Sequence, residues 1–190
     1  RASLLTGLYS HQAGIGQMVS DRGTPAFKGD LSKNAVTIAE VLKMVGYSTY
    51  LSGKWHITPY DDSPSGIENP DKTNWPIQRG FDKFFGMISG AGSFFDPRSL
   101  AIDNEYIPPS EDFYFTDNVS ENAVKFINQN SKEDPFFMYV SYTAPHWPLH
   151  ALPDDILKYK GKYDKGWDKV RNERINRMRE MGLIKKEWEL

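Results

Sequence analysis

The apolar side chains between residues 36 and 45 recur at the spacing of an α-helix. They occupy positions i, i+3, i+4 and i+7, namely Ile38, Val41, Leu42 and Val45. This pattern predicts an amphipathic helix that buries these side chains, with Gly46 as its C-terminal stop. The β-prone residues 47–52 follow at once, so the chain reads helix, tight turn and strand, which is half of an α/β unit.

A second unit of the same kind runs from Asp117 to residue 142. Asp117 has a side chain suited to an N-cap, and the predicted helix then carries one apolar face, made of Val119, Ala123, Phe126 and Ile127. After a turn at residues 130–134, residues 136–142 form a continuous apolar run with little alternation. Such a run favours a strand buried on both faces, as in a parallel sheet. We therefore expect an α/β fold with a mostly parallel sheet flanked by helices.

The remaining segments give weaker signals. Residues 1–9 predict a short helix that closes at Gly7, with Arg1, Leu4, Leu5 and Leu8 on one face. Residues 61–74 read as a loop, and residues 94–111 read as irregular with a short hairpin near 102–107. The basic tail predicts a helix over about 166–181. A solvated surface explains its charge most simply, and contact with an anionic glycan is the alternative.

Composition narrows the class of protein. The 190 residues are 39% hydrophobic and 25% charged, which is typical of one globular domain with a sizeable core. The net charge of −2 gives no support to a nucleic-acid partner, and no apolar run approaches the roughly 20 residues of a transmembrane helix. The absence of cysteine excludes disulfides and thiolate chemistry within these residues. The chain begins without methionine, so we expect its true start, and any export signal, to lie outside this sequence.

Two of the predicted strands lead into loops with similar chemistry. Residues 47–52 lead to Lys54 and His56, and residues 136–142 lead to His146. Ligands of open α/β sheets bind beyond the carboxyl ends of the strands, so parallel strands would bring these three side chains together. Each loop taken alone also fits a histidine with a purely structural or surface role.

The types of residue in these loops point to ester chemistry. A lysine ammonium attracts anionic oxygen, and a histidine can orient a nucleophile or protonate a leaving group. This set suits hydrolysis of a sulfate or phosphate ester. A metal centre has less support, because prolines around His146 and His150 disfavour the helix that would align them. The adjacent acids Asp61 and Asp62 are more typical of a solvated loop.

Several segments resemble the sulfatase family. The first seven residues, Arg1-Ala2-Ser3-Leu4-Leu5-Thr6-Gly7, resemble the end of the family's main signature. Further similar segments follow in the family's order: Gly53-Lys54-Trp55-His56, Arg79-Gly80-Phe81-Asp82 with Phe85-Gly86, and Ala144-Pro145-His146-Trp147-Pro148-Leu149. The run from this last segment through residues 160–167 is most like bacterial arylsulfatases. Together these matches cover nearly the whole chain.

The resemblance implies a fold and a role for each matched residue. It implies an incomplete, alkaline-phosphatase-like domain, in which residues 1–190 are part of a sulfatase catalytic domain. Arg1 would support a formylglycine hydrate, and Lys54 would bind the sulfate. His56 would hydrogen-bond the nucleophile, and His146 would act as the general acid for the leaving group. The intact protein would then be a sulfuric ester hydrolase.

The resemblance also implies groups that lie outside this chain. The formylglycine precursor would stand four positions before Arg1, and the ligands of a divalent metal, usually calcium, would precede Arg1 and follow Leu190. No metal ligand is therefore expected within these residues, and we expect the fragment alone to be inactive. The substrate would be a small-molecule or glycan sulfate ester, with aryl sulfate, choline sulfate and sulfated sugar all open.

Two alternatives stay open at this stage. One is a phosphonate or phosphodiester hydrolase of the same superfamily, which would share the fold and much of the site. The other is a non-catalytic homologue that binds sulfated glycans, although the presence of Lys54, His56 and His146 argues against it. The cellular location is unknown from the sequence, and the resemblance is compatible with a periplasmic or secreted protein.

Overall fold

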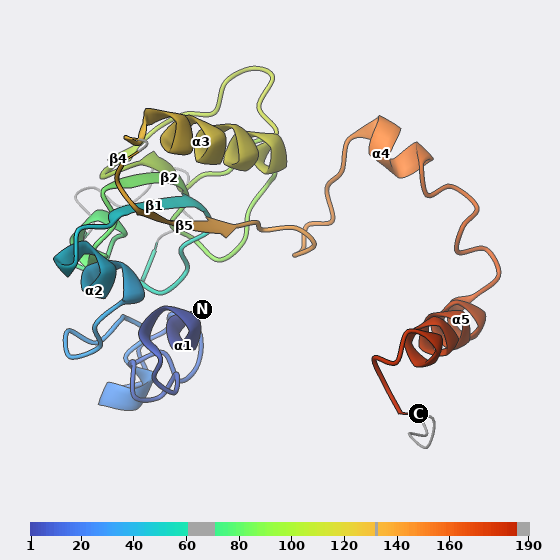
Figure 1. The fold of residues 1–190 in the computed structure, drawn as a ribbon, viewed down its shortest axis with the longest axis horizontal. Helices are drawn as coiled ribbons and strands as arrows, with labels where there is room; N and C mark the ends of the chain where they lie inside the picture. The colour runs from blue at the N-terminus through green and yellow to red at the C-terminus, as the bar shows by residue number, and fades with distance from the viewer. Residues whose placement is uncertain (61–70, 132, 186–190) are drawn as a thin grey trace. The chain divides into compact units, whose positions relative to one another are not determined.

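The computed structural model describes residues 1–60, 71–131 and 133–185, which form two compact units, Arg1–His150 and Ala151–Leu190. The first unit contains a five-stranded sheet with the order β4-β3-β2-β1-β5 (Figure 1). Its strands are β1 (Ser48–Gly53), β2 (Lys83–Met87), β3 (Leu100–Ile102), β4 (Glu105–Tyr106) and β5 (Phe136–Ser141). The predicted acids Asp61 and Asp62 lie outside the described residues.

The sheet is mixed, and its parallel part carries the predicted site loops. Strand β1 runs parallel to both β2 and β5, whereas β2–β3 and β3–β4 are antiparallel. The register pairs Ser48 with Phe136 and Gly53 with Ser141, so β1 and β5 end at the same edge. This arrangement confirms the α/β class, and β3 and β4 confirm the expected short hairpin.

Helices cover both faces of the sheet (Figure 1). Helix α3 (Phe115–Gln129) packs on one face, where Tyr50 joins Val119 and Phe126 in an apolar cluster. Helices α1 (Ala2–Thr6) and α2 (Ile38–Met44) belong to the other face, where Leu51 lies in a second cluster with Leu5 and Ala39. Successive residues of β1 thus point to opposite layers, as the pleat of a strand requires.

Helix α2 forms as predicted, but its buried face is not the predicted one. Ile38, Val41 and Val45 are 40%, 51% and 67% exposed, while Ala39 is fully buried. Polar contacts set the rotation of the helix about its axis. Thr37 and Glu40 form a reciprocal capping box, and Glu40 also binds the guanidinium of Arg79 at 3.2 Å. The side of α2 that faces the core is therefore the side that carries Ala39.

Strand β5 corrects a second expectation. Phe136 and Val140 are 41% and 38% exposed, so this strand is not buried on both faces. It pairs only with β1 and forms one edge of the described sheet, which leaves its outer side without a neighbouring strand.

The start of α3 also differs slightly from the prediction, because Tyr114 is its N-cap and Asp117 lies in its first turn. Helix α1 ends at Gly7 as predicted, but it buries Ala2 and Leu5 and leaves Leu4 exposed.

A buried arginine joins three segments beneath the sheet. Arg79 ends the short 3-10 helix η2 (Ile77–Arg79) and is only 5% exposed. Its guanidinium donates to the side chain of Asn74 at 2.6 Å and to the backbone carbonyl of Ala35, beside its ion pair with Glu40. These charge-assisted bonds hold α2, a loop and η2 together. A second 3-10 helix, η1, spans Pro25–Phe27.

The second unit, Ala151–Leu190, contains α4 (Pro153–Leu157) and α5 (Trp167–Glu180). Helix α5 matches the predicted tail helix closely, whereas α4 was not anticipated. Most of α5 is exposed, including Trp167 at 92%, and Ile175 is its one buried residue. Among the described residues, no helix combines the length and apolar character that crossing a membrane would require.

Candidate active site

Three consecutive backbone N–H groups fix the loop that leaves β1. Lys54 donates to the carbonyl of Ser141 at 2.8 Å, Trp55 to that of Met87 at 2.9 Å, and His56 to that of Ile88 at 3.1 Å. The loop is thus bound first to β5 and then to the end of β2. Trp55 is fully buried and acts as its apolar anchor.

Gly53 is needed where this loop begins. Its φ of 124° is rarely adopted by other residues, and a Cβ atom at this position would lie 2.2 Å from the carbonyl oxygen of Ser141. Gly86 of β2 faces it, because a Cβ there would lie 1.7 Å from the carbonyl oxygen of Gly53. Neither glycine can therefore carry a side chain, because a Cβ at position 53 would collide with β5 and one at position 86 would collide with β1.

The side chain of Lys54 is buried and has no carboxylate partner among the described residues. Burial, and to a smaller extent the nearby positive charge of Arg1, lower the pKa of Lys54 to about 8. An ammonium in this position is stabilised by an anion. The geometry therefore fits a site for an anionic group.

His56 follows at a left-handed backbone position, with φ of 56°. Burial is the largest cause that lowers its pKa to about 4, followed by the charges of Lys54 and Arg1 and then by His146. The imidazole is thus neutral at pH 7. Its Nε2 atom is buried and has no hydrogen-bond partner in the described part of the chain.

Arg1 comes from the start of α1 and meets both parallel strands. Its Nη1 donates to the carbonyl of Lys54 at 2.9 Å and to the hydroxyl of Tyr139 at 3.0 Å. Ser141 also donates to the carbonyl of Lys54, at 2.7 Å. The loop after β1 is thereby connected to α1 and β5.

Tyr139 and Ser141 were not among the sequence candidates. They stand two residues apart on β5 and thus on one face of the strand. This spacing is the only signal in the sequence that could have singled them out.

His146 lies on the loop after β5, between two cis X-Pro bonds at Pro145 and Pro148. Its backbone N–H donates to Thr143, and its Nδ1 lies 2.6 Å from the carbonyl oxygen of Trp147. The side chain is exposed, yet its charge contributes to the lowered pKa of His56. The structure therefore brings Arg1, Lys54, His56 and His146 together at one edge of the sheet.

A cavity of about 230 Å³ opens beside these groups. Its lining residues are Arg1, Ala2, Ser3, Ser10, Ile15, Met18, His56 and Ile57. Two of the four predicted site residues, Arg1 and His56, thus face one hollow of a size suited to a small polar group.

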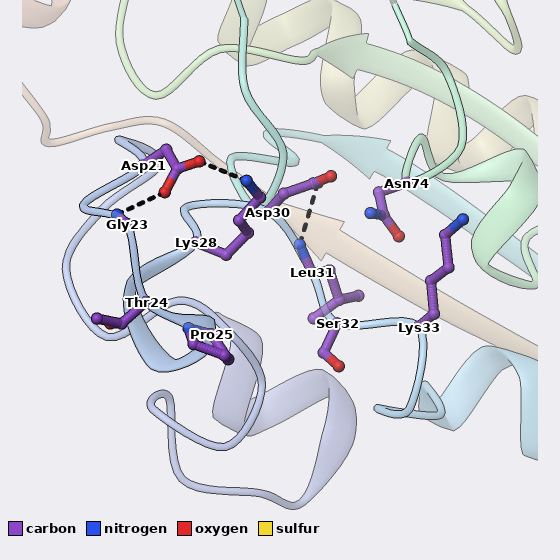
Figure 2. A pocket seen from close by; sticks show the side chains of 10 residues that line it. All are labelled: Asp21, Gly23, Thr24, Pro25, Lys28, Asp30, Leu31, Ser32, Lys33 and Asn74. Carbon is purple, nitrogen blue, oxygen red and sulfur yellow. Dashed lines mark hydrogen bonds and ion pairs between the residues drawn. The ribbon is translucent and has the colours of Figure 1, made fainter.

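A larger hollow of about 490 Å³ lies elsewhere in this unit and contains none of the predicted site residues (Figure 2). Its charged groups largely satisfy one another. Asp21 pairs with Lys28 and accepts a bond from the backbone of Gly23, while Asp30 accepts one from the backbone of Leu31. We therefore place the chemistry at the smaller cavity.

The residues present do not fit a metal ion. Within residues 1–60, 71–131 and 133–185, no three His, Asp or Glu side chains are placed to hold one. His150 has a structural contact instead, because its Nδ1 accepts a bond from the backbone of Phe94 at 3.2 Å.

Beyond the carboxyl ends of its parallel strands, where open α/β sheets bind ligands, the sheet carries a buried lysine and two histidines. The fold that it shares with solved sulfatase structures is alkaline-phosphatase-like. A sequence model of the sulfatase family matches residues 1–182. The chain belongs to the sulfatase family.

Individual relatives and solved structures agree with this assignment. The chain is 33% identical to an arylsulfatase of Klebsiella aerogenes over 97% of its own length and 40% of that protein. It is 31% identical to an uncharacterized sulfatase of Schizosaccharomyces pombe, over 97% of this chain and 36% of the relative. The chain thus spans well under half the length of these relatives.

Two solved structures show a similar fold with bound sugars. One, Ps i-CgsB in complex with k-i-k-neocarrahexaose, has a TM-score of 0.66 and 27% identity, covering 84% of this chain and 37% of the other. The second, BT4656 in complex with its substrate D-glucosamine-2-N,6-O-disulfate, has a TM-score of 0.58 and 25% identity, covering 83% of this chain and 26% of the other.

Proposed function

We propose that the protein containing this chain hydrolyses organic sulfate esters, releasing an alcohol or phenol and sulfate. The observation that carries the proposal is the buried Lys54 ammonium, unpaired with any described carboxylate, beside two histidines and an arginine at one sheet edge. The Lys54 and Arg1 cations stabilise a sulfate group as its negative charge shifts during bond cleavage.

Each residue has a distinct task in this proposal. Lys54 binds a sulfate oxygen, and neutral His56 accepts a hydrogen bond that orients the nucleophile. Arg1 supports the nucleophile's position, since its guanidinium is held by Tyr139 and the carbonyl of Lys54. His146 protonates the leaving oxygen as the sulfur–oxygen bond breaks. The Nδ1–H of His146 donates to the Trp147 carbonyl, so the imidazolium form of His146 transfers its proton from Nε2 to the ester oxygen and becomes a neutral imidazole.

The family resemblance extends the proposal to groups outside the described residues. A formylglycine would supply the hydrate hydroxyl that attacks sulfur, and calcium would be the divalent metal of the intact protein. The described residues do not fit a metal, so its ligands would have to come from elsewhere in that protein. No step assigned to Arg1, Lys54, His56 or His146 depends on the metal.

The substrate class proposed is a small-molecule or glycan sulfate ester. The similarity to an arylsulfatase supports the first form, and the similarity to structures with bound neocarrahexaose and glucosamine disulfate supports the second. A periplasmic or secreted location would give such an enzyme access to these substrates.

The full-length protein should be assayed on paired substrates, an aryl sulfate and an aryl phosphodiester. We expect turnover of the sulfate ester, and we expect Lys54→Met and His146→Gln to lower kcat/KM by on the order of 10²-fold. Lys33→Met and His150→Gln are the matched controls, because the proposal gives neither side chain a role, and both variants should retain activity. Preference for the phosphodiester would support the hydrolase alternative, and tight binding of a sulfated glycan without turnover would support the non-catalytic one.

A further inference from the structure

Gly90 lies directly against the imidazole ring of His56. A Cβ atom at position 90 would stand 2.4 Å from both Cε1 and Nε2 of that ring and 2.8 Å from Cδ2. These distances are far shorter than any van der Waals contact between carbon and its neighbours. The ring therefore occupies the space that any other residue at position 90 would fill.

The backbone of Gly90 does not itself require glycine. Its φ lies outside the left-handed range that disfavours other residues, in contrast to Gly53 and Gly86. The same holds for Gly92, two residues further along. The need for glycine at position 90 thus comes from the neighbouring ring and not from the local fold.

Hydrogen bonds before and after Gly90 keep its backbone in place. Ile88 donates to the carbonyl of Ser99 at 3.1 Å, and the backbone of Ser89 donates to the Ser99 hydroxyl at 3.0 Å. The hydroxyl of Ser89 in turn donates to the carbonyl of Ala91 at 3.1 Å. A side chain added at position 90 would therefore displace the ring more readily than this backbone.

The ring itself is held by packing on this side. Its Nε2 is buried without a hydrogen-bond partner among the described residues, so no polar contact fixes this edge of the imidazole. Tyr60 contributes a second ring, 5.9 Å from the first between centroids. Contact with the bare backbone of Gly90 is thus what limits how far the imidazole can move on its Nε2 side.

We propose that Gly90 is a positioning residue, and that its lack of a side chain sets the place of the His56 imidazole in the site. The catalytic consequence rests on the proposed sulfate-ester hydrolysis, whereas the placement of the ring can be measured without it. Gly90 lies outside every sequence segment that was predicted to form the site, yet it would set the position of His56, which lies inside one of those segments.

The test compares Gly90→Ala with Gly92→Ala in the full-length protein. A Cβ at position 92 would meet only ordinary contacts, the nearest being the sulfur of Met87 at 3.5 Å. The pKa of His56 is followed by NMR of labelled histidine, with the resonance assigned from a His56→Gln variant. The folded ring should titrate at about 4 in the unmodified protein.

We expect Gly90→Ala to raise the pKa of His56 toward its ordinary value, because a displaced ring is less buried, and Gly92→Ala to leave it unchanged. The value of kcat/KM for a sulfate ester should fall by on the order of 10²-fold in Gly90→Ala and stay within about twofold in the control. An unchanged His56 pKa in Gly90→Ala would overturn the proposal. A changed pKa in a protein that never turns over sulfate esters would instead refute the proposed function alone.

A second comparison applies if Gly90→Ala destabilises the protein too strongly for titration. In a His56→Ala background the colliding ring is gone, so Gly90→Ala should leave the midpoint of thermal unfolding nearly unchanged. An equal loss of stability in both backgrounds would show that Gly90 does not act through His56, and the proposal would fail.

Discussion

The guanidinium of Arg1 donates a hydrogen bond to the hydroxyl of Tyr139 at 3.0 Å, joining two residues that lie 138 positions apart in the sequence. The same Nη1 atom also donates to the carbonyl of Lys54. Tyr139 therefore helps to determine where a positive charge stands relative to Lys54 and His56, although it carries no charge itself.

Removal of this hydroxyl should weaken catalysis without unfolding the protein. We expect Tyr139→Phe to lower kcat/KM about fivefold, which corresponds to about 1 kcal/mol for a charge-assisted bond near solvent. Tyr142→Phe is the matched control, because it removes a hydroxyl bonded to Ser120 at 2.7 Å, with no contact to Arg1. An equal fall in kcat/KM in the two variants would show that the bond from Arg1 to Tyr139 has no special role in the site.

The charge of Lys54 predicts how anion binding depends on pH. Because the pKa of Lys54 is lowered to about 8, its ammonium is largely present at pH 7 and is lost as the pH rises above 8. Inhibition of the intact enzyme by inorganic sulfate should therefore weaken between pH 8 and 10. In Lys54→Arg the cation persists across this range, so the same weakening in that variant would argue against Lys54 as its source.

The lowered pKa of His56 predicts a stability change on the acid side. The unfolded chain takes up this proton near pH 6.5, whereas the folded protein takes it up only near pH 4. The contribution of the buried, neutral His56 to the free energy of unfolding is thus complete above pH 6.5, and it is lost as the pH falls toward 4. Urea denaturation between pH 7.5 and 4.5 should show a smaller decline in His56→Gln than in the unmodified protein, and identical declines would contradict this.

The buried Arg79 predicts a large effect on stability. Arg79→Ala removes the guanidinium donors from Glu40, Asn74 and Ala35, and we expect the free energy of unfolding to fall by about 3 kcal/mol. Lys28→Ala, which breaks only the solvent-exposed pair with Asp21, should have a much smaller effect in the same denaturation experiment. If Arg79→Ala lowered the free energy of unfolding no more than Lys28→Ala does, the Arg79 network would contribute little to stability.

The sequence predicted the elements that bear the site better than it predicted their burial. Helix–turn–strand order located α2, β1, α3 and β5, because hydrophobic spacing and glycine stops are local properties. The exposed face of α2 could not be foreseen, since its rotation depends on the bond between Glu40 and Arg79, 39 residues apart. Strand β2 was not identified, because its residues Lys83–Met87 show no clear alternation of apolar and polar positions.

The site was foreseen to the extent that short motifs carry it. Lys54, His56 and His146 lie beyond β1 and β5, as the parallel order implied, and the structure adds their contacts with Arg1. The roles of Tyr139 and Gly90 arise from contacts between segments far apart in the chain. The spacing of Tyr139 and Ser141 shows only that they share one face of β5, and no local pattern reveals the contact of Tyr139 with Arg1 or of Gly90 with His56, because both depend on how distant segments pack.

The paired glycines at positions 53 and 86 have a consequence for how this sequence can vary. A Cβ at position 53 would collide with the backbone of Ser141, and one at position 86 would collide with the backbone of Gly53, so a smaller side chain at a neighbouring position relieves neither collision. A second substitution at a neighbouring position therefore cannot rescue a substitution of either glycine. In a library that randomises both positions together, the functional survivors should contain glycine at both, whereas exposed Val41 and Val45 should vary freely.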